Sequence, residues 1–421
     1  MRSTLLLIIG FVGANCKEAL KRNVNISSDF SSDVTYQAGL STPELILYWG
    51  YPVQTYDVVT EDGYILQLHR IPYGRNAQPA DKKPVVFLQH GLEASSNNWV
   101  SNLPHQSAAF IFADQGFDVW MGNMRGNRYS KRHVRLHPMK KDFWRFSFDQ
   151  MAKYDLDAMI NAVLNETGHE SLYYVGHSQG TLTMFSKLSM DPNFNKKIKK
   201  FFALAPVGTV KHIGGILKFI AHTFYDLVRI GSKFVGNGEF LPNSWLYRTF
   251  TQLICGDKLG NVLCDNFLFL ITGPDSHQIN VTRTPVYAAQ VPAGTSVQNI
   301  IHWAQLVRTG ALKQYDFANL KENIQHYGSK TPPAYNLKQT NAPVYLFWSD
   351  FDWLADKKDI EEFLIPNLRK DYLVENIQIP KYNHMDFVFG VNASQDVYYP
   401  ILNRIRLDLG KQPIEFNNYV F

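Results

Sequence analysis

The sequence lacks the features that identify nucleic-acid-binding proteins. Its 421 residues carry a formal net charge of only +5. No run of lysine and arginine exceeds the short one at residues 196–200, which enters an apolar strand pattern and fits a solvated loop or strand entry. Nucleic-acid-binding proteins normally show a long basic run or a strongly basic face. We therefore expect no nucleic-acid partner.

Long hydrophobic runs are also missing, so no transmembrane segment is expected. The apolar run at residues 5–12 is too short to span a bilayer; it follows Arg2 and precedes small residues. This order is typical of an export signal, and we expect a signal peptide at residues 1–16. Export, for example to a gut lumen, is the expected route, with the lysosome as the alternative destination. Four sequons agree with export and are expected glycosylation sites: Asn25, Asn165, Asn280 and Asn392.

Cysteine is scarce. Of the three cysteines, Cys16 lies in or beside the signal, which leaves Cys255 and Cys264 in the mature chain. In an oxidising compartment the economical interpretation is one disulfide that closes a small loop, and two buried thiols are the alternative. Two cysteines without a second pair of ligands do not indicate a metal site. No nucleotide or flavin motif is present either, so neither a metal nor a cofactor is expected.

Strand and helix patterns are present in abundance, and they alternate. Hydrophobic residues make up 45% of the chain, enough for a large core. Alternation of short apolar strands with helical stretches predicts an α/β fold with a mostly parallel sheet flanked by helices. The expected strands are at 56–60, 64–70, 84–89, 117–120, 172–175, 201–205, 343–348 and 374–379, and the expected helices at 42–50, 107–114, 151–167 and 357–364.

The alternation stops in the middle of the chain. Residues 207–340 are helical in pattern and rich in aromatic side chains, and they contain the cysteine pair. We therefore expect one sheet domain, built from residues 17–206 and 341–421, with residues 207–340 as a helical insertion. No internal repeat or low-complexity segment is present.

The motif Gly-His-Ser-Gln-Gly at 176–180 carries the clearest chemistry. It follows a β-prone stretch and precedes a helix-prone one. A strand that turns sharply into a helix exposes the side chain at its corner, and small residues on either side let the neighbouring elements approach. The motif therefore predicts a nucleophile elbow with Ser178 as the attacking residue.

A serine nucleophile needs a base and an acid that orients the base. In this type of fold the chain order is Ser, Asp or Glu, then His, each after a strand. His384 is the histidine that follows the last expected strand. Three aspartates follow the strand before it, and spacing alone does not choose among them, although the last resembles a helix N-cap: Asp350, Asp352 and Asp356.

The negative oxygen that forms during ester cleavage needs two N–H donors. The N–H of Gln179, directly after the nucleophile, is one candidate. Leu92, in the loop after an earlier strand, is well placed to supply the other. The simpler interpretation of that loop is an ordinary turn at the end of a strand.

From residue 42 to about residue 398 the chain resembles the acid lipases, the animal family that includes gastric lipase and lysosomal acid lipase. The resemblance rests on many motifs in the same order along the chain. They include Tyr-Trp-Gly-Tyr-Pro at 48–52, Thr-Glu-Asp-Gly-Tyr-Ile-Leu at 60–66, His-Gly-Leu at 90–92, Asn-Asn-Trp at 97–99, Asp-Val-Trp at 118–120, Arg-Gly-Asn at 125–127, Met-Ala-Lys-Tyr-Asp at 151–155, Tyr-Val-Gly-His-Ser-Gln-Gly-Thr at 174–181, Pro-Ala-Gly-Thr-Ser-Val-Gln-Asn at 292–299 and Tyr-Asn-His at 382–384.

The resemblance implies an α/β-hydrolase fold and a catalytic triad of Ser178, Asp352 and His384. It also implies that residues 207–340 form a cap and lid, with Cys255 and Cys264 as a disulfide. The sequence departs from the family at 349–351, where Ser-Asp-Phe replaces a turn that contains glycine, and this keeps Asp350 as a rival acid.

The function expected from these residues is a lipase that cleaves carboxylic esters of neutral lipids: triacylglycerol and, as a further substrate, cholesteryl ester. Apolar residues recur at helical spacing over 216–235, where they could close the site in water and rest on lipid when open. Plain core packing of the insertion is the other explanation. The expected partner is a lipid–water interface, and the expected state is a monomer. The alternatives are an esterase for smaller or sterol esters and a non-catalytic lipid-binding protein.

Overall fold

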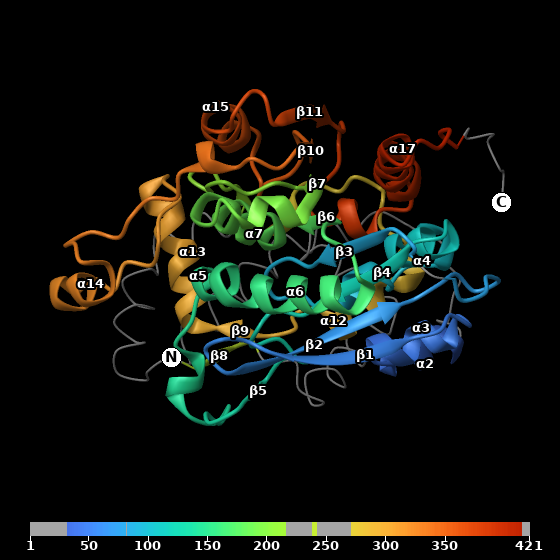
Figure 1. The fold of residues 1–421 in the computed structure, drawn as a ribbon, viewed down its shortest axis with the longest axis horizontal. Coiled ribbons are helices and arrows are strands. Elements are labelled where there is room, and N and C mark those ends of the chain that lie inside the picture. Colours follow the sequence, from blue (N-terminus) through green and yellow to red (C-terminus); the bar gives the residue numbers. More distant parts are fainter. Residues whose placement is uncertain (1–31, 81, 216–237, 242–270, 415–421) are drawn as a thin grey trace, which may run out of the picture.

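The computed structural model describes residues 32–80, 82–215, 238–241 and 271–414 (Figure 1). Several expectations lie outside these residues: the signal peptide at 1–16, Asn25, the apolar stretch at 216–235, Cys255 and Cys264. Of the described helices, none is long and apolar enough to cross a bilayer.

A nine-stranded sheet forms the centre of the molecule. Eight strands follow the order β1-β2-β4-β3-β6-β7-β10-β11, and β5 pairs with β2. From β4 to β11 every neighbouring pair is parallel, whereas β2 is antiparallel to β1, β4 and β5. The expected mostly parallel sheet is therefore confirmed. The strands are β1 (Gln54–Val59), β2 (Tyr64–Ile71), β3 (Val85–Gln89), β4 (Asp118–Gly122), β5 (Arg132–His133), β6 (Leu172–His177), β7 (Ile198–Leu204), β10 (Val344–Trp348) and β11 (Leu373–Gln378).

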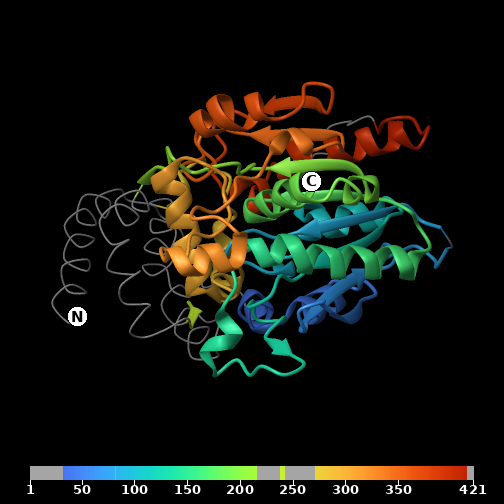
Figure 2. The same ribbon diagram turned by 60° about the vertical axis from the view of Figure 1, so that its left-hand side comes forward.

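The central strands are apolar throughout because both faces of the sheet are covered. Every residue of β3, β4, β6 and β10 is buried, as expected for parallel strands between layers of helices. The flanking helices include α4 (Ala108–Asp114), α6 (Leu156–Thr167), α7 (Gln179–Met190), α15 (Ile365–Asn367), α16 (Asp386–Phe389) and α17 (Tyr399–Asp408) (Figures 1 and 2).

The helix expected at residues 151–167 is present, but it begins differently. It continues from α5 (Phe148–Gln150) through a π-helical turn, Met151–Asp155, into α6. Gly168, at φ +68°, ends it in the left-handed conformation that glycine adopts without strain.

The helix expected at 42–50 is α3 (Thr42–Tyr48), next to α2 (Ser32–Gly39). Its N-cap is Ser41, although the next residue, Thr42, is also of a type that caps helices. Glu44 accepts hydrogen bonds from the Ser41 N–H at 2.7 Å and from its hydroxyl at 2.6 Å. Thr42 is instead buried, and its N–H and hydroxyl both bond the Tyr129 hydroxyl.

After β7 the chain leaves the sheet, and it returns at β10, the neighbour of β7. The described elements in between gather at one end of the sheet, on the left in Figure 2. They include a short β8–β9 ribbon that sequence patterns did not predict, because two-residue strands leave no periodic signal. The elements are β8 (Glu239–Phe240), α12 (Thr284–Gln290), β9 (Thr295–Ser296), α13 (Val297–Thr309) and α14 (Leu320–Tyr327).

Candidate active site

Ser178 lies at the corner between β6 and α7. Its backbone has φ +53° and ψ −119°, a strained conformation for a residue with a side chain. The flanking glycines explain how the corner fits. A Cβ on Gly176 would lie 2.9 Å from the backbone of Gly180, and one on Gly180 would lie 2.5 Å from the carbonyl oxygen of Gln89. No larger residue could occupy either position without moving the neighbouring strand or helix.

His384 and Asp352 meet at the same edge of the sheet, in the loops after β11 and β10. The His384 Nδ1 atom lies 2.9 Å from one carboxylate oxygen of Asp352 and 3.0 Å from the other. The carboxylate also accepts the N–H groups of Leu354 and Ala355, both at 2.8 Å. Both side chains of the pair are buried. The pair is therefore held in one orientation, with the imidazole Nδ1 bonded to the carboxylate.

The other two aspartates bond elsewhere. Asp350 is exposed and accepts the N–H of Lys381 at 3.1 Å. Asp356 accepts the N–H of Lys358 at 2.8 Å, the hydrogen bond expected of a helix N-cap. Within the described residues, Asp352 is thus the member of the trio that contacts His384.

His177, which sequence reasoning passed over, connects the serine corner to the His384 loop. Its Nε2 lies 2.9 Å from the carbonyl oxygen of His384, and the two ring centroids are 4.9 Å apart. Burial lowers the pKa of His177 to about 3, so the ring is neutral and Nε2 donates to the carbonyl. This contact places the His384 backbone beside the residue that precedes Ser178. In the sequence, the only sign that His177 belongs to the site was its position within the elbow motif.

The two N–H groups that the sequence predicts as oxyanion donors belong to Leu92 and Gln179, two residues near Ser178. Gly91 packs directly on it, since a Cβ on Gly91 would lie 3.0 Å from the Ser178 Cβ. This brings the next residue, Leu92, to the same corner. Gln179 is the first residue of α7, where backbone N–H groups have no acceptor within the helix.

The side chain of Gln179 is held by α13. Its amide oxygen accepts hydrogen bonds from Asn299 Nδ2 at 2.8 Å and from Trp303 Nε1 at 2.7 Å. Asn299 Oδ1 in turn accepts the Phe148 N–H at 2.8 Å. The sequence motif that ends at Asn299 gives no sign of this contact, because the two helices are more than 100 residues apart in the chain.

Glu93, the residue after Leu92, is held by the same part of the chain. Its carbonyl accepts the Ala293 N–H at 2.6 Å, and its carboxyl accepts the Gly294 N–H at 2.9 Å. Burial raises the pKa of Glu93 to about 8. We call residues 293–303 the clamp segment, because they bind the side chains next to both candidate N–H donors.

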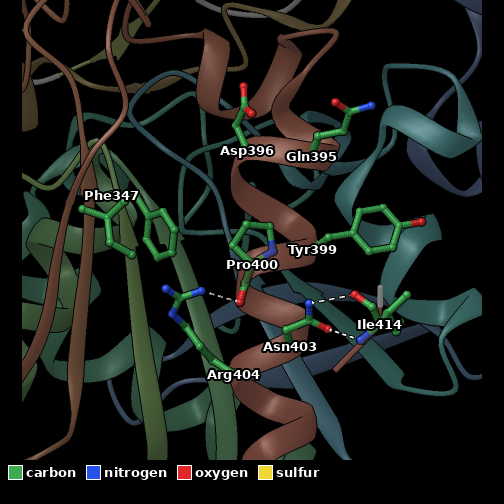
Figure 3. A pocket seen from close by; sticks show the side chains of 9 residues that line it. Phe347, Gln395, Asp396, Tyr399, Pro400, Asn403, Arg404 and Ile414 are labelled. Atoms are coloured by element: carbon green, nitrogen blue, oxygen red, sulfur yellow. Dashed lines mark hydrogen bonds between the residues drawn. The ribbon is translucent and has the colours of Figure 1, made fainter. Parts of the chain in front are cut away.

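Two other features lie apart from this site. Among the described residues, His212, Asp356 and Asp359 bring ligand atoms within 4.8 Å of one another, but His212 already bonds Asp359 through both its ring and its N–H. A hollow beside α17 is shown in Figure 3. Two of its polar side chains bond within the protein: Arg404 donates to the Pro400 carbonyl, and Asn403 donates to the Ile414 carbonyl.

A serine on a strained strand-to-helix turn, beside a bonded Asp–His pair at the carboxyl ends of parallel strands, is the arrangement of the α/β-hydrolases. Residues 84–391 match the family described as alpha/beta hydrolase fold, and residues 42–103 match its partial alpha/beta-hydrolase lipase region. A crystal structure from Acinetobacter baumannii has the same fold, with a TM-score of 0.50 at 15% identity over 92% of this chain and 99% of that chain.

Within this class, similar sequences identify the family. Lipase lipl-1 of Caenorhabditis elegans is 53% identical, covering 90% of this chain and 95% of the relative. Human gastric triacylglycerol lipase is 44% identical, covering 88% of this chain and 92% of the relative. Mouse lipase member K is also 44% identical, covering 89% of this chain and 92% of the relative. The chain belongs to the acid lipase family, as the motifs predicted.

Proposed function

We propose that this protein is a serine lipase that hydrolyses the ester bonds of neutral lipids, with triacylglycerol as the main substrate class. The observation that carries the proposal is the Asp352–His384 pair, tied through His177 to the strained corner at Ser178. The names of the relatives, gastric triacylglycerol lipase among them, support the substrate class.

The proposed reaction has two halves. The Ser178 hydroxyl oxygen attacks the ester carbonyl while His384 takes its proton, and His384 then gives the proton to the departing alcohol. This leaves the acyl group on the serine. Water repeats the attack with His384 as base, releasing the fatty acid and the free serine. Asp352 orients the imidazole and stabilises its charged form throughout.

The N–H groups of Leu92 and Gln179 would stabilise the negative oxygen that forms in each half. Such donors contribute most when they are fixed before the reaction starts. The clamp segment supplies that fixation by binding Gln179 directly and by binding Glu93, the neighbour of Leu92.

The surroundings of the site are proposed on the same basis. We infer that residues 207–340 act as a cap and lid over the site, with a disulfide between Cys255 and Cys264. We also infer that the protein is secreted or delivered to lysosomes and that it is glycosylated. It would act as a monomer at the lipid–water interface. The exposed side chains of Asn165 and Asn392 are accessible to glycosylation, whereas Asn280 is half-buried and caps its own turn through Thr282.

The test compares emulsified long-chain triacylglycerol with a soluble short-chain ester across pH, for the wild type and Ser178→Ala. Activity on the emulsion that disappears in the variant is the expected result. Activity on the soluble ester alone would make the protein an esterase. No hydrolysis of either substrate by folded protein would favour the non-catalytic lipid-binding alternative. Cholesteryl ester in the same emulsion decides whether sterol esters are substrates.

A further inference from the structure

A basic segment protrudes beside the site. Residues 131–145, here called the basic loop, contain β5 and lead towards α5 along the lower edge of Figure 1. The loop has six lysines and arginines against one acidic residue, Asp142. This excess of positive charge is as large as that of the entire chain. Because apolar residues separate the basic ones, the sequence shows no long basic run.

Half of these cations have no counter-charge among the described residues. Lys131 pairs with Glu239, Arg132 with Asp57, and Arg145 with Asp142. The other three form no ion pair within the part of the chain that the structure describes, and all three are exposed: Arg135, Lys140 and Lys141. An anionic partner could therefore bind them without first displacing an internal carboxylate.

Exposed apolar side chains lie among the same cations. Met139 is 87% exposed, the highest value among the exposed large hydrophobic side chains of the described residues, and Val134 is 53% exposed. Lys140 and Lys141 follow Met139 directly. Apolar side chains surrounded by lysine and arginine match the two layers of a lipid surface, acyl chains below and charged headgroups above. An acidic protein surface would satisfy the cations but not Met139.

The loop is anchored by buried side chains. Trp144 donates its indole N–H to the Pro138 carbonyl at 2.6 Å, and Phe143 accepts a hydrogen bond from the Tyr64 hydroxyl at its carbonyl. Phe143, Trp144 and Phe146 are all buried. The exposed side chains are therefore displayed from a fixed base.

Both ends of the loop attach next to the clamp segment. Lys131 pairs with Glu239 on β8, which is paired with β9, and Ser296 on β9 donates its hydroxyl to the Phe146 carbonyl at 2.5 Å. Figure 2 shows the loop below the elements that follow β7. A surface bound by the loop would thus lie on the side of the molecule that carries the clamp segment.

We propose that the basic loop docks the protein on a phospholipid surface with negatively charged headgroups. Arg135, Lys140 and Lys141 bind the headgroups, and Met139 enters the layer beneath them. If the proposed function is correct, docking also brings the site to its substrate. The docking proposal itself does not depend on the proposed function.

The test uses the full-length chain with Ser178→Ala, so that no lipid is hydrolysed. Its partition onto phosphatidylcholine vesicles is measured by sedimentation, with and without phosphatidylglycerol. The loop variant changes three cations: Arg135→Glu, Lys140→Glu and Lys141→Glu. We expect the loop variant to lose roughly a hundredfold in partition onto the anionic vesicles, at about 1 kcal/mol for each cation.

A second variant changes the net charge equally at the opposite end of the parallel strands. It carries the substitutions Lys82→Glu, Lys370→Glu and Lys411→Glu, all at exposed residues. We expect it to keep most of the partition. Equal losses in the two variants, or unchanged partition of the loop variant, would overturn the proposal; unchanged partition is also the result expected if the loop binds an acidic protein.

The variant Met139→Ser tests whether the Met139 side chain enters the lipid layer, without changing the charge of the loop. It should lower partition several-fold on anionic vesicles while leaving the salt dependence unchanged, because the cations remain. No loss would contradict the role given to Met139. With Ser178 intact, unchanged turnover of a soluble ester by the loop variant shows that the variant is folded.

Discussion

At the scale of single residues, the site combines strain with close fixation. Ser178 holds a backbone conformation of the kind that costs about 1–3 kcal/mol and persists only where surrounding structure enforces it. Gly176 and Gly180 make the corner possible, and His177 binds the loop of His384. Stability has been given up at this position to hold one hydroxyl at the corner between β6 and α7.

The strain predicts that Ser178→Gly stabilises the protein while abolishing hydrolysis. Glycine adopts positive φ without penalty, and this gain exceeds the extra entropy that it loses on folding. We expect a Tm increase of about 1–2 °C. Ser178→Ala is the control, since it removes the hydroxyl and keeps the Cβ. Thermal unfolding measures both, and equal Tm values would show that the corner is not strained.

The Asp352–His384 pair predicts unequal roles for two neighbouring aspartates. Asp352→Asn should lower kcat roughly 10³–10⁴-fold, because an amide bonds the wrong imidazole tautomer and cannot stabilise its charge. Asp350→Asn should leave kcat within about twofold, since Asp350 bonds the Lys381 N–H and the neighbouring Ser349 hydroxyl and makes no hydrogen bond to His384 among the described residues. Initial rates on a soluble ester give the comparison. A comparable loss in Asp350→Asn would make Asp350 the acid.

At the scale of elements, the clamp segment connects α13 to the start of α7. Asn299 supplies a donor to Gln179 and an acceptor to Phe148, so its amide is satisfied on both sides. Gln305, on the same helix, is also buried and makes two hydrogen bonds to the Asp316 backbone, away from Gln179.

We therefore predict that Asn299→Leu lowers kcat about tenfold or more with little change in KM, because Gln179 loses a fixed partner. Gln305→Leu should destabilise the protein to a similar degree through its own lost hydrogen bonds, yet keep kcat. Steady-state kinetics with thermal unfolding separates the two effects. If kcat falls equally in both variants, the clamp contributes stability alone.

Central strands were the easiest elements to predict from the sequence. Strands buried on both faces read as unbroken apolar runs, and the glycines beside Ser178 marked the turn. The sequence did not decide between Ser41 and Thr42 as the cap, because both residue types cap helices; the burial of Thr42 against Tyr129 leaves Ser41 in that position. The π-helical turn at Met151–Asp155 leaves no pattern of its own.

The contacts of the site were harder to predict. Three aspartates within seven positions have the same chemistry, and the turn geometry after β10 decides which one meets His384. Glu93 and Asn299 act through residues far away in the chain. Such pairings follow from packing of the connection between β7 and β10 on the rest of the protein, which no local period encodes.

At the scale of the whole molecule, buried ionisable groups set opposing pH dependences. Burial raises the pKa of Glu93 to about 8 and of Asp386 to about 7, above their unfolded values of about 4, so these two groups lower stability as pH rises from about 4 to about 8. Burial lowers the pKa of His69 and His177 to about 3 and of His90 to about 4, so stability also falls as pH drops below about 6.5.

The folded protein should therefore be most stable in mildly acidic solution, with the Tm falling between pH 6.5 and 8. Glu93→Gln keeps the hydrogen bond from Gly294 without an ionisable proton, and it should flatten this alkaline decline. Thermal unfolding from pH 4 to pH 9 gives both profiles. An identical alkaline decline in the variant would mean that Glu93 does not ionise there.

The crossover between β7 and β10 has a consequence for how this protein could diversify. A parallel crossover needs only about a dozen residues, yet this one contains about 140. Lengthening a connection costs little free energy, because loop-closure entropy grows only slowly with length. Natural selection can therefore rewrite most of this connection while the sheet and its hydrogen-bond register stay unchanged. New substrate preferences could arise there without the folding penalty that the same number of substitutions would carry in the strands.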